Sequence, residues 1–84
     1  MDSEPPHLTV DARGHRCPVP TLRLRRALEG MSEGQQVVLL ADDPMARIDV
    51  PHFAGQTGHC VVELRETASG LAFTVEKRGA AHLS

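Results

Sequence analysis

The residue best suited to covalent chemistry is Cys17, which is followed directly by Pro18 and a segment of apolar and arginine residues. Proline is favoured at the first position of an α-helix, so we expect a helix to begin there. The sulfur would then face unpaired backbone N–H groups and the positive end of the helix dipole. Together with Arg16 and His15, this environment lowers the pKa of a thiol and predicts a nucleophilic thiolate at neutral pH.

The alternative for Cys17 is a structural role as a small buried hydrophobic side chain, a common place for a free cysteine. Its position favours exposure, because Gly14 allows a flexible turn before it, and Pro18 and Pro20 stiffen the chain after it. An exposed thiolate can attack the outer sulfur of a donor and then present that sulfur to an acceptor. We therefore expect Cys17 to be accessible.

The second cysteine, Cys60, starts a segment that alternates with period two. This counting places it on one strand face with Val62 and Leu64 and predicts that it is buried in the core. The alternative is a resolving cysteine, which would require Cα atoms of Cys60 and Cys17 about 4.4–6.8 Å apart. No Cys-x-x-Cys or spaced histidine pair is present, so we expect no metal site and no bound cofactor.

After Cys17, a set of four residues in the first predicted helix forms a candidate surface for contact with a partner protein. Helical counting places Val19 and Leu22 on the outward side, near Arg23 and Arg26. Exposed apolar side chains among cations are suited to dock an acidic surface. The alternative is an ordinary solvated helix face.

The composition argues against several classes of function. The 84 residues include 9 basic and 11 acidic ones, and the net charge of −2 gives no overall attraction for nucleic acid or an anionic membrane. No apolar run approaches the ~20 residues of a membrane span, and the first residues do not resemble a signal peptide. We expect a cytoplasmic monomer with reduced thiols that binds neither nucleic acid directly nor a membrane.

Strands and helices must position these residues. Apolar spacing predicts one helix from Pro18 to about Gly30, with a buried stripe of Pro20, Leu24, Ala27, Leu28 and Met31. It also predicts four strands, over residues 8–11, 35–41, 60–66 and 71–76.

A second helix is expected between the second and third strands. Because Pro51 would break a helix begun at Pro44, we expect a short turn there and a helix over about 50–57, ended by Gly58. The nearby carboxylates are interpreted as helix caps, since each stands beside a helix start; they are Asp42, Asp43 and Asp49.

The order βαβαββ predicts an α/β fold of the two-layer (α+β) sandwich type, with a four-stranded mixed sheet and two helices on one face. A chain of this length supports one core. We expect a single domain over 8–78, between a flexible leader (1–7) and a flexible tail (79–84).

Four motifs follow one another along the chain: Asp11-Ala-Arg-Gly14-His-Arg-Cys17-Pro18-Val-Pro20, Ala41-Asp42-Asp43-Pro44, Asp49-Val50-Pro51 and Gly58-His59. Together they resemble the TusA/SirA-like sulfur-carrier family over roughly residues 8–78. The resemblance implies the same fold and a persulfide carried on the Cys-Pro-x-Pro cysteine. It also implies a sulfur donor, either a cysteine desulfurase or another sulfurtransferase, and a downstream acceptor protein.

The motifs do not choose among the pathways of the family, which are tRNA thiolation, molybdenum cofactor sulfur chemistry and sulfur oxidation. Asp11 matches the family motif, and we expect it to hydrogen-bond the cysteine loop; its alternative is an ordinary turn former at a strand end. The remaining supporting residues are Gly14, Arg16, Pro18 and Pro20.

A function of a different class is also compatible with these residues. In a non-catalytic redox-sensing or regulatory interaction module, Cys17 would sense redox state or support binding. Persulfide loading separates the two hypotheses, because a carrier accepts and returns sulfur through Cys17, whereas an interaction module keeps its function in Cys17→Ser.

Overall fold

The structure of the protein is a computed structural model that describes residues 8–16 and 18–78. The strands are β1 (Leu8–Asp11), β2 (Gln36–Ala41), β3 (Cys60–Thr67) and β4 (Gly70–Glu76), and the helices are α1 (Val19–Glu29) and α2 (Ala46–Thr57). The expectations of a flexible leader and a flexible tail lie outside the described residues, as does Cys17 itself.

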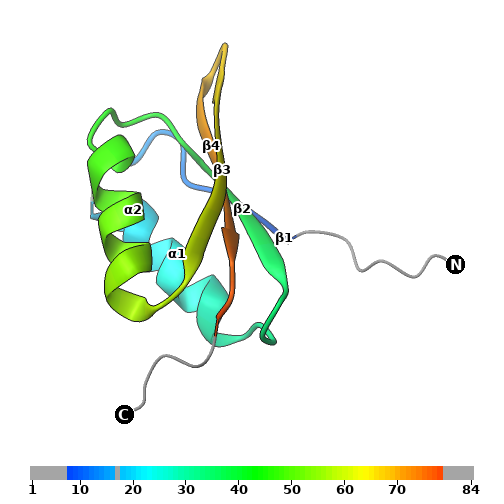
Figure 1. Cartoon of the computed structure of the whole chain (residues 1–84). Helices are drawn as coiled ribbons and strands as arrows, with labels where there is room; N and C mark the ends of the chain where they lie inside the picture. Colours follow the sequence, from blue (N-terminus) through cyan, green and yellow to red (C-terminus); the bar gives the residue numbers. More distant parts are fainter. Residues whose placement is uncertain (1–7, 17, 79–84) are drawn as a thin grey trace, which may run out of the picture.

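The four strands form one mixed sheet in the order β1-β2-β4-β3. β1 is parallel to β2, whereas β4 is antiparallel to both of its neighbours. Both helices cover the same face of this sheet (Figure 1). The predicted βαβαββ two-layer sandwich with a four-stranded mixed sheet is therefore confirmed.

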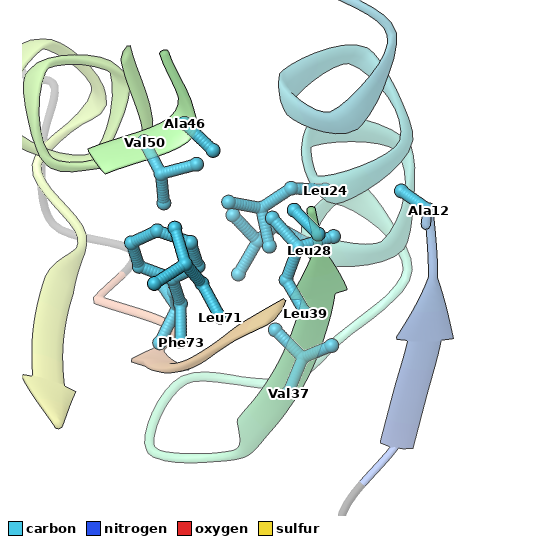
Figure 2. Close-up of a cluster of buried hydrophobic side chains, with 11 residues drawn as sticks. Ala12, Leu24, Leu28, Val37, Leu39, Ala46, Val50, Leu71 and Phe73 are labelled. Carbon is cyan, nitrogen blue, oxygen red and sulfur yellow. The ribbon is translucent and has the colours of Figure 1, made fainter. Parts of the chain in front are cut away.

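One buried cluster joins the helices to the sheet (Figure 2). Leu24 and Leu28 of α1 and Val50 of α2 point onto Leu39 of β2 and Phe73 of β4. The predicted stripe of α1 is confirmed: three of its residues are buried, and Ala27 and Met31 pack against the cluster from its margin. β2 lies at the centre of the sheet, which explains its continuous apolar sequence.

The second helix differs from the sequence prediction. It runs without interruption over Ala46–Thr57 and contains Pro51, so the expected helix start at Val50 is wrong. Pro51 is exposed, as is Arg47, four residues earlier. The missing proline N–H would have reached the Arg47 carbonyl, and solvent can take its place on this side of the helix. Gly58 ends the helix with a φ of 81°, as predicted.

The prediction that Cys60 lies in the core with Val62 and Leu64 is also wrong. Cys60 is half-buried, and the other two side chains are 44% and 39% exposed. An irregularity at Val62 shifts the register, because this one extra residue of β3 lies between Val61, which pairs with Val75, and Glu63, which pairs with Thr74. Val61 pairs with the buried Val75, and Cys60 is therefore on the sheet face opposite the helices.

Candidate functional site

The candidate site lies where the chain leaves β1 and β2. Parallel strands end at the same edge of a sheet, so the loop after β1 meets the turn after β2. A hydrogen bond of 2.8 Å from the Ala12 N–H to the Leu40 carbonyl extends this pairing beyond β1. An open cleft of about 660 Å³ lies between the two segments, and it is lined by Gly14, His15, Arg16, Pro18, Asp42, Asp43, Pro44, Met45 and Asp49.

The loop before Cys17 begins with a tight turn. The His15 N–H donates to the Ala12 carbonyl at 3.3 Å, and Gly14, the third residue of this turn, has a φ of +86°. This left-handed conformation favours glycine, because a side chain there crowds the backbone. A flexible turn was expected at Gly14; the structure has a hydrogen-bonded turn there, over residues 12–15.

Asp11 holds the first part of the loop. Its carboxylate accepts hydrogen bonds from the Arg13 backbone N–H at 3.1 Å and from its guanidinium Nε and Nη2 at 2.9 Å each. These bonds hold the pKa of Asp11 at about 2, below its ordinary value of 3.8. The loop thus hydrogen-bonds Asp11 as expected, through a residue that the sequence reading did not single out, Arg13.

Asp42 holds the next residue of the loop. The Gly14 N–H donates to both carboxylate oxygens of Asp42, each at 3.0 Å. The prediction that Asp42 caps a helix is therefore wrong, because its side chain points to a different segment of the chain. Its neighbour Asp43 does hold the turn before α2, where Oδ1 accepts the Met45 N–H at 3.0 Å.

The first helix begins immediately after the loop. Pro18 is its N-cap rather than its first helical residue, with φ and ψ of −96° and 15°, and its carbonyl accepts the Leu22 N–H at 3.0 Å. The first turn of α1 has no acidic residue, so no carboxylate from this turn offsets the positive end of its dipole. The cleft carries both signs of charge, since Arg16 and three aspartates line it.

The structure brings together only part of the predicted site. Gly14, Arg16 and Pro18 line the cleft, whereas Pro20 is on the buried side of α1. The four candidates for partner contact lie on α1 outside the cleft lining; Leu22 is 54% exposed and Val19 is half-buried, and the other two, Arg23 and Arg26, are exposed. The Arg23 guanidinium also reaches back to the Asp11 carbonyl, at 3.5 Å.

The sequence reading missed the contribution of the turn after β2 and of the first turn of α2. Met45 and Asp49 line the cleft together with Asp42, although about 30 residues separate them from the loop before Cys17. The signal was available in principle, because a predicted parallel pairing of the first two strands places their following residues at one edge of the sheet.

No group of three His, Cys, Asp or Glu side chains in residues 8–16 and 18–78 is arranged to hold a metal ion. His59 lies immediately before β3, and its Nδ1 accepts a hydrogen bond of 3.0 Å from the Arg78 backbone N–H. Burial and the nearby Lys77 cation lower the pKa of His59. Neither helix in the described ranges is both long and apolar enough to span a membrane.

Comparisons with known proteins agree with this fold. The family model described as Sulfurtransferase TusA matches residues 8–77. The Sulfur carrier protein TusA of Allochromatium vinosum is 38% identical over 68 residues, which cover 81% of this chain and 90% of the relative. The crystal structure of a SirA-like protein from Desulfitobacterium hafniense superposes with a TM-score of 0.69 at 30% identity, covering 82% of this chain and 93% of that one. The match includes both strands and the loop that form the cleft, and the chain belongs to the TusA family of sulfurtransferases.

Proposed function

We propose that the protein is a sulfur carrier that holds sulfane sulfur as a persulfide on Cys17. The observation that carries this proposal is the open cleft at the start of α1, which Arg16 and Pro18 line from either side of Cys17 in the sequence. A persulfide carrier needs a thiolate that two different proteins can reach in turn, and a shallow surface site meets this need better than an enclosed one. Membership of the TusA family supports the same function.

The transfer balances as two exchange reactions. The Cys17 thiolate attacks the outer sulfur of a donor persulfide, the sulfur–sulfur bond of the donor breaks, and the donor leaves as its thiolate. Cys17 then carries a persulfide, whose outer sulfur is attacked by a thiolate of the acceptor in the same manner. The resting Cys17 thiolate is regenerated, and no net oxidation occurs over the cycle.

The proposed partners follow from this cycle. The donor is a cysteine desulfurase or another sulfurtransferase, and the acceptor is a relay protein or a biosynthetic enzyme of tRNA thiolation, molybdenum cofactor or sulfur-oxidation chemistry. We assign the docking of an acidic partner surface to four residues of α1, which are Val19, Leu22, Arg23 and Arg26. The protein would perform this exchange in the cytoplasm as a monomer.

The first test is intact mass after incubation with a cysteine desulfurase and cysteine, with and without reductant. Wild type and Cys60→Ser should gain one sulfur atom that reductant removes, and Cys17→Ser should gain none. The absence of loading from several donors would favour the regulatory interaction module, in which Cys17 senses redox state. The docking surface is tested separately: Leu22→Glu combined with Arg26→Glu should slow loading while the alkylation of Cys17 by iodoacetamide is unchanged.

A further inference from the structure

We propose that Asp42 is a positioning residue for sulfur transfer, because its carboxylate clamps the loop that leads to Cys17. Both oxygens of Asp42 lie 3.0 Å from the Gly14 nitrogen, which is three residues before the cysteine in the chain. The inference rests on the proposed function of Cys17. It adds a residue from the other side of the cleft that keeps the cysteine loop in one conformation.

Asp42 is itself firmly placed. It follows the last residue of the central strand β2, and the start of β4 packs closely against it. A Cβ atom at Gly70 would lie only 3.2 Å from the Cα and Cβ atoms of Asp42. The carboxylate therefore extends from a rigid part of the sheet. The charge-assisted hydrogen bonds from the Gly14 N–H to this carboxylate restrict the motion of the loop.

The loop needs such a contact because its own turn is weakly closed. The His15 N–H lies 3.3 Å from the Ala12 carbonyl, a longer distance than either bond to Asp42. Ala12, at the start of the turn, is buried in the core, but Gly14 has no side chain and His15 is exposed. Packing therefore contributes little to the second half of the turn. Loss of the clamp should let the loop sample other conformations, and a misplaced sulfur transfers slowly even when its chemistry is intact.

Hydrogen bonding, rather than charge, distinguishes Asp42 within the cleft. Asp49 also lines the cleft, but in the described part of the chain no hydrogen bond joins its side chain to residues 12–16. Removal of either carboxylate deletes one negative charge near the loop. Only the change at Asp42 deletes the acceptor of the Gly14 N–H.

Three variants separate these effects: Asp42→Ala, Asp42→Asn and Asp49→Ala. The rate of sulfur loading from a cysteine desulfurase should fall by about tenfold to a hundredfold in Asp42→Ala, because a 1 Å misplacement of a reacting group can cost about a hundredfold in rate. Asp42→Asn keeps a side-chain oxygen that can accept the Gly14 N–H, and it should load close to the wild-type rate. Asp49→Ala should lose clearly less of the rate than Asp42→Ala, because it removes a charge from the cleft but no hydrogen bond to the loop. Equal losses in Asp42→Ala and Asp42→Asn, or in Asp42→Ala and Asp49→Ala, would overturn the clamp in favour of a charge effect.

A second measurement does not depend on sulfur. The hydrogen exchange of the Gly14 amide, followed by NMR on the whole chain, should accelerate in Asp42→Ala and stay slow in wild type and Asp42→Asn. Unchanged exchange in Asp42→Ala would overturn the clamp even if loading fell. If wild type accepted no sulfur, the proposed function would fail, and the exchange of this amide would still decide whether Asp42 holds the loop.

Discussion

At the scale of single residues, the backbone conformation of Gly14 should affect both the stability of the protein and the reactivity of Cys17. Gly14 has a φ of +86°, and a Cβ atom placed there would meet nothing within 4 Å, so Gly14→Ala adds backbone strain without a clash. The strain should lower the free energy of unfolding by about 1–2 kcal/mol. It should also slow alkylation or sulfur loading of Cys17, because the turn is three residues away.

Gly34 provides a matched control for this change. Its φ is +92° and its surroundings are equally open, but it lies in the turn before β2, where its N–H donates to the Lys77 carbonyl. Gly34→Ala should cost similar stability in urea unfolding and leave the reactivity of Cys17 unchanged. If both substitutions altered reactivity alike, a general loosening of the protein would explain the effect better than the turn.

The pair of Asp11 and Arg13 predicts a pH effect. Because hydrogen bonds from Arg13 hold the folded-state pKa of Asp11 at about 2, against an ordinary 3.8, the ionised carboxylate stabilises the folded protein above the ordinary value. This contribution is lost as the pH falls from 3.8 through about 2. The urea midpoint of wild type should therefore fall more steeply over this window than that of Asp11→Asn. Glu33→Gln, at an exposed residue with no ion pair in the described ranges, should keep the wild-type slope.

At the scale of elements, the spacing of apolar residues predicted the buried face of a helix or strand correctly wherever no irregularity interrupted the element. The stripe of α1 and the central strand β2 follow from apolar spacing, and both are as predicted. The alternation of β3 misled, because the register shift at Val62 reverses the face of Cys60 and leaves no local signal in the sequence. Pro51 led to the wrong prediction of a helix break. The free-energy cost of a proline inside a helix depends on whether solvent reaches the carbonyl that it leaves unpaired, here that of the exposed Arg47.

The site was predictable only on one side of the cleft. The residues around Cys17 can be recognised as a candidate site from their unusual local sequence. Asp42, in contrast, resembles any aspartate before a proline-containing turn. Its role depends on the parallel pairing of β1 with β2, a contact between distant parts of the chain. Local sequence rules cannot assign such a partner until the order of strands in the sheet is known.

The junction of β4 with β2 supplies the sharpest prediction for an element. At Gly70, which starts β4 with a φ of +141°, a Cβ atom would lie 2.5 Å from the Ala41 carbonyl oxygen. Because that neighbour is backbone of the central strand, Gly70→Ala should lower the free energy of unfolding by about 2 kcal/mol or more. Ser69→Ala, one residue earlier in the exposed turn, should cost far less. Similar urea midpoints for the two variants would contradict this close packing.

At the scale of the whole molecule, stability depends on one cluster between a single sheet and two helices. Phe73 is fully buried at its centre, beneath Val50 and beside Leu24 (Figure 2). A domain of this size has a free energy of unfolding of about 4–12 kcal/mol. Phe73→Ala should remove about 3–5 kcal/mol of it, a large part of the total.

Leu64 tests whether this loss reflects burial or merely the deletion of a large side chain from the sheet. It is the cross-strand partner of Phe73 on β3, but it remains 39% exposed, because β3 is an edge strand. Leu64→Ala should therefore cost only about 1 kcal/mol, the lower range for partly buried side chains. Far-UV circular dichroism in urea measures both variants in a chain that lacks Trp and Tyr. Equal losses would contradict this explanation, because the exposed edge residue would then contribute as much as the residue buried beneath the helices.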